Sequence, residues 1–405
     1  MKWEKVRLGD VAKVSSSKRI FASQYTKSGV PFYRQKEIID KKNKNEIINP
    51  LFISWETFDD IKKKFGAPNK NDLLITAVGV TLGIPYVVVD EIFYFKDGNL
   101  IWLSNFDENI HSKYLYYWIN SDIGQKIIWS RTIGSAQPAL TIDILKQLEI
   151  PVPIFNTQCK IVKILSAYDD LIENNQKQIK LLEEAAQRLY KEWFVDFRFP
   201  GYEDTKFIDG IPDGWRKQKI SDFGEIKTGK TPSTTKESYY GGHIPFVKIP
   251  DMHNRIYPIA TETTLTSEGA NTQKNQFIPK NSIMVSCIGT VGLVNISIEL
   301  CQTNQQINSI MPNDEKDLYY IYSTMKRLKT LLEGVGSNGA TMTNVNKTKF
   351  GNLEVLYPNY DLRDKYFNNC KVIFEKIFSL SVGIEKLTQA RDRLLPKLMS
   401  GEIEV

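Results

Sequence analysis

The second half of this chain repeats the first half, about 205 to 214 residues later in the sequence. Trp3–Val14 aligns without a gap on Trp215–Ile226, and Asn71–Gly79 aligns on Asn281–Gly289. From Leu148 onward the offset between the copies stays at 205 residues. Solenoid repeats are only about 20–50 residues long. The chain therefore contains a duplicated domain, and it can present two similar surfaces to one partner.

The composition is that of a globular protein with enough apolar residues for sizeable cores. The chain has 405 residues, of which 41% are hydrophobic and 25% charged, and this length suits two or three domains of ~100–200 residues each. It has no apolar run of the ~18 residues that a membrane span needs and opens without an apolar signal segment, so we expect a cytoplasmic protein. The net charge of +6 permits a nucleic-acid partner without indicating one. The four cysteines lack paired spacing, and we expect reduced thiols.

Each copy combines a globular unit with a long helix. Short β-rich runs such as Leu73–Val78 and Tyr86–Val89, separated by Gly, Pro and Asn, predict strands in the first unit. An aromatic-rich segment from His111 to about Trp129 predicts one helix in its core. The fold class is thus α+β. The predicted divisions are a globular domain at 1–155, a long helix at 156–199, a second globular domain at 200–360, and a second long helix with a tail at 361–405.

Both long helices carry residues four and three positions apart, which is the a/d spacing of a coiled coil. In the first helix these positions hold Ile161, Leu165, Tyr168, Ile172, Asn175, Ile179, Leu182, Ala186, Leu189 and Trp193. In the second helix they hold Tyr366, Cys370, Ile373, Ile377, Leu380, Ile384, Leu387, Arg391, Leu394 and Leu398. Arg391 interrupts the second stripe, and Asn175 is a polar residue of the kind that fixes helix register.

Two matched apolar stripes in one chain predict that the two helices pack on each other. A parallel pair would need very long connections, so we expect an antiparallel coiled coil. A helix from about Thr157 to Phe194 is ~55 Å long at 1.5 Å per residue. The alternative, in which each helix covers only its own domain, stays open at this point.

Motifs near the ends of the copies resemble those of one protein family. Gly134–Leu140 (Gly-Ser-Ala-Gln-Pro-Ala-Leu), Leu148–Pro153 (Leu-Glu-Ile-Pro-Val-Pro) and Arg393–Ile403 (Arg-Leu-Leu-Pro-Lys-Leu-Met-Ser-Gly-Glu-Ile) resemble the specificity subunits of type I restriction-modification systems. The domain openings at Trp3 and Trp215 fit this family as well. The resemblance covers almost the whole chain, in the family's order of recognition domain, helix, recognition domain, helix.

The resemblance implies a non-catalytic DNA-recognition subunit with pseudo-two-fold symmetry. Each globular domain would be a target-recognition domain that reads one half of an asymmetric bipartite site in double-stranded DNA. The helices would set the spacer between the half-sites and dock two modification (methyltransferase) subunits, which restriction/translocase subunits would join. S-adenosylmethionine, ATP and Mg²⁺ would bind to those partner subunits, and this chain would bind no cofactor or metal.

Polar and basic residues in loops, several at equivalent places of the two copies, are the candidates for DNA contact. Arg and Gln suit bidentate contacts with guanine and adenine edges, whereas Lys more often contacts phosphates. In the second copy the counterpart of Gly134–Leu140 lacks the Gln-Pro pair, so the resemblance implies no shared role for Gln137. The candidates are Lys18, Arg19, Arg34, Gln35, Lys36, Gln137, Lys227, Lys230, Lys248, Arg255, Asn346 and Lys347.

One motif favours a different class of protein. Gly224–Thr231 satisfies the P-loop pattern G-x-x-x-x-G-K-[ST], in which backbone amides cradle a phosphate and the lysine, here Lys230, reaches the terminal phosphate. The surroundings argue against it, because Arg216–Ile220 is only thinly apolar and a polar loop begins at Pro232. The three histidines have no zinc-binding spacing. A P-loop nucleotide-binding protein is the alternative to a DNA-recognition subunit.

Overall fold

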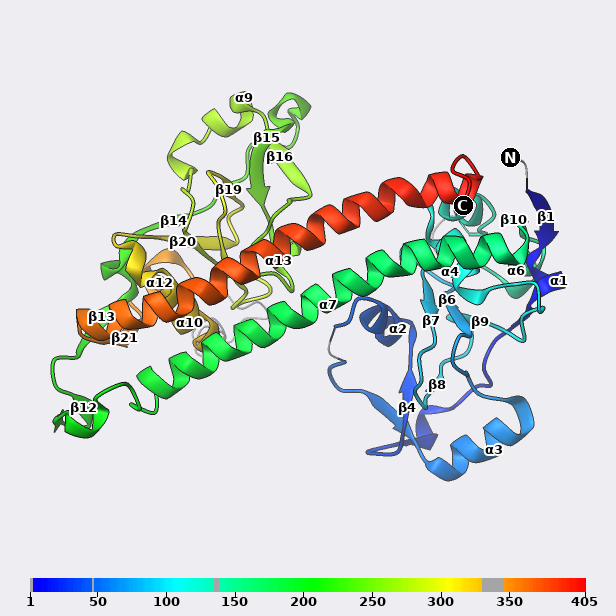
Figure 1. The fold of residues 1–405 in the computed structure, drawn as a ribbon, viewed down its shortest axis with the longest axis horizontal. Coiled ribbons are helices and arrows are strands. Elements are labelled where there is room, and N and C mark those ends of the chain that lie inside the picture. The colour runs from blue at the N-terminus through cyan, green and yellow to red at the C-terminus, as the bar shows by residue number, and fades with distance from the viewer. Residues whose placement is uncertain (1–2, 46, 135–137, 330–344) are drawn as a thin grey trace. The chain divides into compact units, whose positions relative to one another are not determined.

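The computed structural model describes residues 3–45, 47–134, 138–329 and 345–405. The chain divides into two compact units: unit 1 contains Met1–Asp170 and Thr388–Val405, and unit 2 contains Leu171–Leu387. Each unit therefore consists of one globular domain, here called domain 1 or domain 2, and one segment of each long helix (Figure 1). This division follows packing, whereas the boundaries predicted above follow the order of the sequence.

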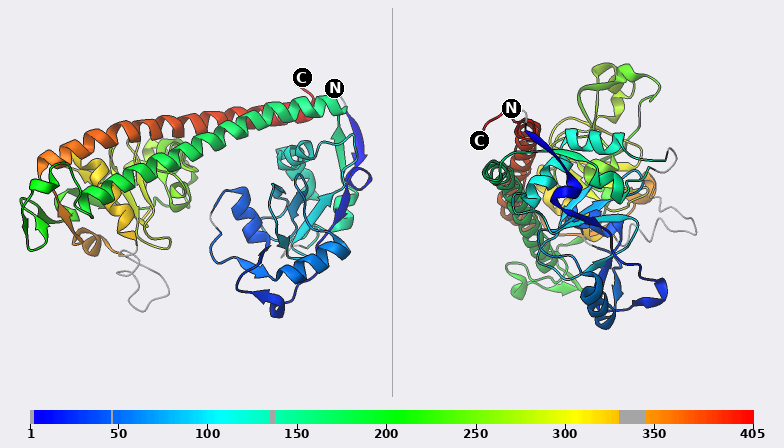
Figure 2. Two further views of the ribbon diagram at one scale, coloured as in Figure 1. Left: turned by 60° about the horizontal axis from the view of Figure 1, so that its bottom comes forward. Right: turned by 90° about the vertical axis from the view of Figure 1, so that its right-hand side faces the viewer.

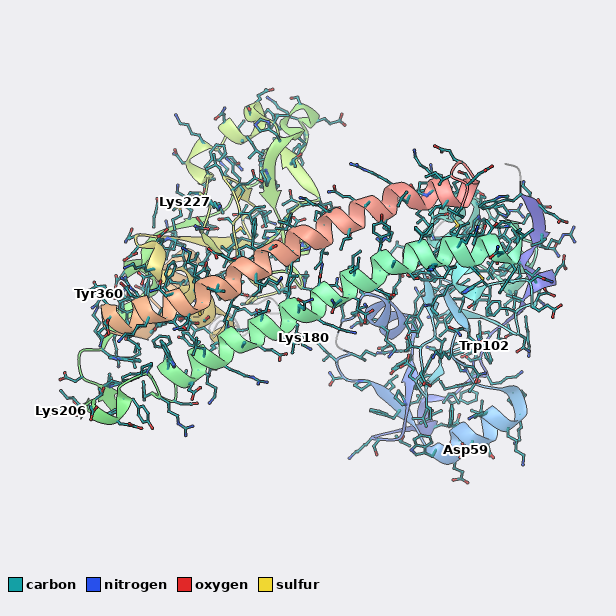
Figure 3. All side chains as sticks on the ribbon, in the orientation of Figure 1. Asp59, Trp102, Lys180, Lys206, Lys227 and Tyr360 are labelled. Atoms are coloured by element: carbon teal, nitrogen blue, oxygen red, sulfur yellow. The ribbon has the colours of Figure 1, made fainter. Side chains whose placement is uncertain are left out.

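Domain 1 contains two four-stranded sheets with the strand orders β2-β9-β6-β7 and β3-β5-β4-β8. Strands β6 and β9 are buried on both faces, and their side chains alternate between two cores. Leu73 and Ile75 face a core that includes residues of the long helices, while Leu74 and Trp102 (Figure 3) face a core with Phe95. The strands are β1 Glu4–Arg7, β2 Lys13–Ser15, β3 Tyr25–Thr26, β4 Val30–Tyr33, β5 Leu51–Ile53, β6 Leu73–Thr76, β7 Pro85–Val87, β8 Tyr94–Phe95, β9 Leu100–Ser104 and β10 Glu149–Val152.

The prediction of one helix from His111 to about Trp129 is wrong, because two helices occupy this segment. Helix α4 ends at Asn120 and α5 begins at Asp122. Ser121 separates them: its backbone is extended, and its hydroxyl oxygen accepts a hydrogen bond from the Gly124 amide (3.1 Å), which caps α5. The helices of domain 1 are α1 Leu8–Val11, α2 Gln35–Lys42, α3 Trp55–Phe65, α4 Ser112–Asn120, α5 Asp122–Ser130 and α6 Ile142–Lys146.

Domain 2 repeats the plan of domain 1. Its four-stranded sheet has the order β14-β20-β17-β18, and β15 pairs with β16 and β19 as β4 pairs with β5 and β8. The strands are β11 Phe207–Ile208, β12 Ile211–Pro212, β13 Arg216–Lys219, β14 Gly224–Thr228, β15 Tyr240–Val247, β16 Thr263–Leu265, β17 Ile283–Ser286, β18 Val294–Ile296, β19 Gln302–Thr303, β20 Ile307–Pro312 and β21 Glu354–Tyr357. The helices are α8 Ile249–Met252, α9 Ser267–Asn271, α10 Leu318–Arg327 and α12 Lys347–Gly351.

The two long helices are α7, Phe155–Phe194, and α13, Tyr360–Ser400. Within each unit their segments lie side by side (Figures 1 and 2). In unit 1, Ile161 near the start of α7 shares a core with Leu398 near the end of α13. In unit 2, Trp193 near the end of α7 contacts Tyr366 near the start of α13, with ring centres 6.0 Å apart. The helix segments are therefore antiparallel in each unit. Across the described ranges, none of the helices combines the length and apolarity that crossing a bilayer requires.

The residues predicted to pair the helices lie at buried or half-buried positions. The domains cover part of the same stripes, since the core of unit 2 joins both helices to residues of domain 2 such as Tyr320. The apolar stripes thus serve the partner helix and the domain together. The buried predicted residues are Ile161, Leu165, Ile172, Ile377 and Leu380, and the half-buried ones are Asn175, Ile179, Leu182, Leu189, Ile373, Ile384, Leu387 and Leu394.

A buried amide near the start of α7 joins this helix to domain 1. The side chain of Gln158 is fully buried. Its Nε2 donates to the carbonyl oxygens of Asn109 (2.9 Å) and Pro153 (2.8 Å), and its Oε1 accepts a hydrogen bond from the His111 amide (2.9 Å). All hydrogen bonds of this contact are neutral.

A buried guanidinium makes the corresponding contact in unit 2. Arg363 lies 205 residues after Gln158, and its side chain is 6% exposed. Its Nη1 donates to Asp314 (2.7 Å) and Asp317 (3.4 Å), and its plane lies over the ring of Tyr360, the first residue of α13 (Figure 3), with 4.8 Å to the ring centre. Burial opposes ionisation, but the hydrogen bonds to neighbouring acidic groups outweigh it and raise the pKa of Arg363.

A second contact joins the helices to domain 1 at the middle of α7. Asp169 accepts hydrogen bonds from the hydroxyl of Tyr117 on α4 (2.6 Å) and from Nη1 of Arg391 on α13 (2.7 Å). Arg391, which interrupts the predicted apolar stripe, is therefore paired. The counterpart of Asp169 is Phe374, a fully buried ring that stacks on Tyr319 of domain 2 with 4.4 Å between ring centres.

Candidate nucleic-acid interface

Five segments of domain 1 meet through hydrogen bonds, and we call them loop cluster 1. Gln35 Nε2 donates to the carbonyl of Val78 (2.9 Å) and to the hydroxyl of Thr81 (2.8 Å), which joins the start of α2 to the β6–β7 loop. The amide of Gly79 donates to the carbonyl of Pro138 (2.9 Å). The segments are residues 16–20, 34–36, 77–84, 96–99, and 131–140 without 135–137.

The first loop of domain 1 is held against the turn that follows β8. The amide of Lys18 donates to the hydroxyl of Tyr94 (2.8 Å). Arg19 Nε donates to Asp97 Oδ2 (2.9 Å). These two contacts place the basic first loop beside the turn at 96–99.

Five segments of domain 2 form the corresponding loop cluster 2. The amide of Lys230 donates to the carbonyl of Thr303 (3.0 Å), and Thr231 Oγ1 donates to Gln305 Oε1 (2.6 Å). The first loop of domain 2 is therefore also held against the turn after the parallel strand, here β19. The segments are residues 227–231, 248–255, 287–293, 304–306 and 345–347.

Two main-chain hydrogen bonds of loop cluster 1 recur at equivalent places in loop cluster 2. In cluster 1 the amide of Lys96 donates to the carbonyl of Tyr33 (2.9 Å), and in cluster 2 the amide of Asn304 donates to the carbonyl of Val247 (3.2 Å). Likewise, the amide of Leu140 donates to the carbonyl of Ala77 (2.8 Å) in cluster 1, and the amide of Val345 donates to the carbonyl of Cys287 (2.9 Å) in cluster 2. The two clusters therefore share a backbone scaffold. Their side chains differ, because most aligned positions in these loops hold different residues.

Three candidates of domain 1 are exposed in loop cluster 1: Lys18, Arg19 and Lys36. The Lys18 ammonium lies 4.7 Å from the centre of the Phe65 ring. Exposed cations on one cluster of loops are suited to contact phosphates or base edges. Gln137 lies outside the described residues.

Two other candidates of domain 1 hold the scaffold itself. Arg34 pairs with the buried carboxylate of Glu37, and this hydrogen bond raises the pKa of Arg34. Gln35 uses its amide group to brace the β6–β7 loop, as described above. Both side chains therefore bind other groups of domain 1 and stabilise the conformation of loop cluster 1.

Four candidates of domain 2 are exposed in loop cluster 2: Lys230, Asn346, Lys347 and Arg255, of which Arg255 also makes a local contact described below. The side chain of Asn346 caps α12 by accepting a hydrogen bond from the Lys349 amide (2.9 Å). Lys230 and Lys347 point their charges to solvent-accessible space, since both residues are exposed.

Arg255 and the two remaining candidates of domain 2 are engaged in local contacts. Lys227 (Figure 3) is half-buried and donates to the carbonyl of Phe277 (3.1 Å). Lys248 pairs with Glu262 (3.3 Å), and exposed Arg255 donates to a main-chain carbonyl of its own loop (3.1 Å). These contacts hold all three side chains in place.

Sequence reasoning missed the turns after β8 and β19. Asp97 and Gln305 contact the first loops of their domains. Both turns are short polar segments that connect buried strands, β8 to β9 in domain 1 and β19 to β20 in domain 2. Aligning the parallel pairs β4–β8 and β15–β19 would have found them, because the register pairs Tyr33 with Phe95 and Val247 with Thr303.

The P-loop alternative is incompatible with the structure. Gly224–Thr228 forms strand β14, whose backbone pairs along its length with β20, so its amides cannot cradle a phosphate. The motif's glycines have a packing role, because a Cβ at Gly224 would collide with the Met311 carbonyl and one at Gly229 with the Asn304 carbonyl. The segment after Lys230 starts no α-helix.

Histidines and cysteines form no metal site in the described ranges. There, His, Cys, Asp and Glu form no group of three or more that could hold a metal ion. The imidazole of His111 caps α4 by accepting a hydrogen bond from the Lys113 amide (3.2 Å). The four cysteines are unpaired thiols, and burial raises the pKa of Cys287 to about 11 and that of Cys301 to about 12.

Comparison with known proteins connects this architecture to one family. The family model described as "Type I restriction modification DNA specificity domain" matches residues 1–184 and 212–380. The chain is 34% identical over 327 residues to the type I restriction enzyme HindI specificity subunit of Haemophilus influenzae, covering 66% of this chain and 71% of that protein. It is 28% identical over 309 residues to the type I restriction enzyme MjaIX specificity subunit of Methanocaldococcus jannaschii, covering 74% and 70%.

A solved structure shares the fold. The crystal structure of a type I restriction-modification system S subunit from M. genitalium aligns with a TM-score of 0.58 at 16% identity, over 98% of this chain and 96% of that chain. Each of the two segments matched by the family model contains one globular domain and part of the long helix that follows it. The family resemblance and the α+β fold class predicted from the sequence are confirmed, and the chain belongs to the type I restriction-modification DNA specificity family, as a DNA-recognition subunit rather than a catalytic one.

Proposed function

We propose that each domain reads one half of an asymmetric bipartite site in double-stranded DNA through its loop cluster, while α7 and α13 set the spacer. One observation carries this proposal: the two loop clusters share main-chain hydrogen bonds but present different side chains. Backbone contacts can orient a protein on DNA, but only side chains that differ can read different bases. One scaffold with two surfaces suits two different half-sites.

The charges of the two clusters suit this division of labour. Lys18 and Lys36 in cluster 1, and Lys230 and Lys347 in cluster 2, are exposed cations that would contact phosphates. Such contacts release counterions and make binding weaken as salt rises. The chain's net charge of only +6 is sufficient because these lysines are gathered in the loops.

The length of the helices suits a spacer between half-sites. With 40 residues at 1.5 Å per residue, α7 is ~60 Å long. At 3.4 Å per base pair this length corresponds to roughly 18 base pairs. If this length takes in both half-sites as well as the bases between them, the centres of the half-sites would be about one turn of DNA apart.

The proposed partners are two modification (methyltransferase) subunits that dock on the long helices, and restriction/translocase subunits that join them in the cytoplasm. Exposed apolar side chains on the helices support docking: Leu181 is 65% exposed and Val372 is 70% exposed. S-adenosylmethionine, ATP and Mg²⁺ would bind to these subunits, which would carry out the chemistry.

The test is methylome sequencing of a host that expresses the chain with its modification subunits. The expected result is methylated adenine in a bipartite motif whose two halves differ in sequence. A single continuous motif, or no sequence-specific methylation by an assembled complex, would contradict the proposal. Duplex binding by the same complex should also weaken steeply between 50 and 200 mM salt, by a factor of about 10³ if six phosphates are contacted.

A further inference from the structure

One exposed side-chain contact of loop cluster 1 recurs in loop cluster 2 with both of its residues changed. In cluster 1, Arg19 Nε donates to Asp97 Oδ2 (2.9 Å). In cluster 2, Thr231 Oγ1 donates to Gln305 Oε1 (2.6 Å). In each case the first loop of the domain contacts the turn after the parallel strand.

Sequence and strand register agree that these two contacts are equivalent. The gapless alignment of the domain openings has an offset of 212, which places Arg19 at Thr231 if it is extended by five residues beyond Val14. Phe95 and Thr303 hold the same register positions on the parallel strands, and two residues further along lie Asp97 and Gln305. The contact is retained while its chemistry has changed from ionic to neutral.

Stability does not explain why this contact is kept. The Arg19 side chain is 69% exposed, Gln305 is exposed, and an exposed ion pair contributes only about 0–1 kcal/mol. When two domains read different sequences, their recognition surfaces need the same contact position to carry different side chains, and that is the case here.

The pair in cluster 1 presents donors in a fixed orientation. Asp97 is the less exposed partner, at 19%, and it binds the guanidinium at Nε. Among the described residues, Nη1 and Nη2 of Arg19 have no hydrogen-bond partner. Two in-plane N–H donors match the O6 and N7 acceptors of guanine in the major groove.

The pair in cluster 2 presents an amide in a fixed orientation. The hydroxyl of Thr231 binds Oε1 of Gln305 and fixes the amide plane, and Nε2 has no hydrogen-bond partner among the described residues. An amide oxygen has two lone pairs, so Oε1 can accept a second hydrogen bond. An oriented Gln amide matches the N7 acceptor and the N6 donor of adenine.

We propose that Arg19 and Gln305 are specificity-determining residues of the two domains, Arg19 reading a guanine in one half-site and Gln305 an adenine in the other. Asp97 and Thr231 are positioning residues that orient them. This inference rests on the proposed function, because it assigns bases to a recognition role proposed for the loop clusters.

The experiment compares the methylated motif, and the binding of the complex to duplexes with single base changes, for the wild-type complex and for R19A and Q305A. Each variant should lose preference at one position of one half-site, with discrimination at that position falling roughly ten- to a hundred-fold. The two variants should affect opposite half-sites. R19K should not restore discrimination, since an ammonium lacks the planar pair of donors, and D97N should weaken it at the same position as R19A.

The matched control is R7A, which removes an exposed arginine on β1 outside the loop cluster and should leave the motif unchanged. An unchanged motif in both R19A and Q305A overturns the inference. So does an equal loss of affinity for all duplexes, which marks phosphate contact or damage to the fold. The wild-type complex separates the two proposals: a bipartite wild-type motif with unaffected variants leaves the proposed function standing and removes only this inference.

Discussion

Gln158 in unit 1 and Arg363 in unit 2 occupy equivalent positions, and they fix a long helix to a domain by different chemistry. Gln158 makes neutral hydrogen bonds to main-chain groups of Asn109 and His111. Arg363 makes ionic ones, to the carboxylates of Asp314 and Asp317. The contact between helix and domain, here called a joint, is therefore retained although its chemistry is not.

The second joint follows the same rule. Asp169 binds Tyr117 and Arg391, whereas its counterpart Phe374 stacks on Tyr319. A polar residue on α7 and an apolar one on α13 both hold the domain at the same level of the helix. What the two units have in common is thus the place where each domain is attached, which is the property needed to separate two readers by a fixed distance.

The largest effect is expected at the ionic joint. Arg363→Ala leaves the carboxylate of Asp317, itself 6% exposed, without its cation, and should lower the free energy of unfolding by about 3–5 kcal/mol. Arg363→Gln, which imports the unit 1 residue, should not restore it, because the carboxylates remain. Urea unfolding measures both. Lys365→Ala, at a 53% exposed side chain on the same helix, is the control and should change stability by less than about 0.5 kcal/mol; a similar small loss in Arg363→Ala would contradict the account.

Disrupting the neutral joint should lower the free energy of unfolding by less than disrupting the ionic joint. Gln158→Ala removes three hydrogen bonds and leaves the buried groups that they satisfied, at a cost of about 1–3 kcal/mol. Gln158→Arg should cost more than Gln158→Ala, because Gln158 contacts main-chain groups of domain 1, whereas Arg363 pairs with carboxylates of domain 2. Adding Asn109→Asp, which introduces a carboxylate at a residue that Gln158 contacts, should recover part of that loss in thermal unfolding. No recovery in the double variant would contradict the view that a buried cation here needs a carboxylate partner.

A smaller effect is expected at Asp169, because this ion pair is half-exposed. The side chains of Asp169 and Arg391 are 32% and 26% exposed, so Asp169→Ala should cost about 1–2 kcal/mol, between the values for exposed and buried pairs. A double-mutant cycle with Arg391→Met measures the coupling directly, and it should exceed about 0.5 kcal/mol. Additive effects of the two substitutions would refute a joint through this pair.

The smallest effect is a pH dependence beside the polar joint of unit 1. Burial, and secondarily the charge of Arg391, lowers the pKa of Lys42 to about 8. The unfolded lysine has a pKa of about 10.4, so between these values the unfolded chain holds a proton that the folded chain lacks. Lys42 should therefore make the free energy of unfolding rise with pH, by at most about 1.4 kcal/mol per pH unit. Lys42→Met should show a smaller rise between pH 7.5 and 9.5, and an identical slope would contradict this assignment.

The long helices could be predicted from the sequence because their signal is periodic and local. The a/d spacing around Ile161 and Leu380 identifies the buried stripe wherever the partner lies. The aromatic segment at 111–129 misled the prediction, since its apolar content hides the helix break at Ser121, although Ser followed by Asp is a common helix start.

The joints and loop clusters could be predicted only in part, because they depend on tertiary contacts. The sequence places a Gln at 158 and an Arg at 363, but their partners lie about 50 residues away and are brought close by the fold. Arg19 was recognisable as a basic loop residue, whereas Gln305 gains its position from the register of β15 and β19. The P-loop pattern failed for the same reason, since Gly224 packs against the Met311 carbonyl of β20 and Gly229 packs against the Asn304 carbonyl.

The central claim is that the helices hold two independently reading domains at a set distance, and changing the helix length tests it most directly. One heptad inserted after Asp170 in α7 and one after Leu387 in α13 lengthens both helices at the boundary between the compact units, and it leaves Asp169 and Arg391 together in unit 1. Seven residues add ~10.5 Å, or about three base pairs. Binding to duplexes with a series of spacer lengths should then show an optimum about three base pairs longer, with both half-site sequences unchanged. An optimum at the wild-type spacer length would contradict the account.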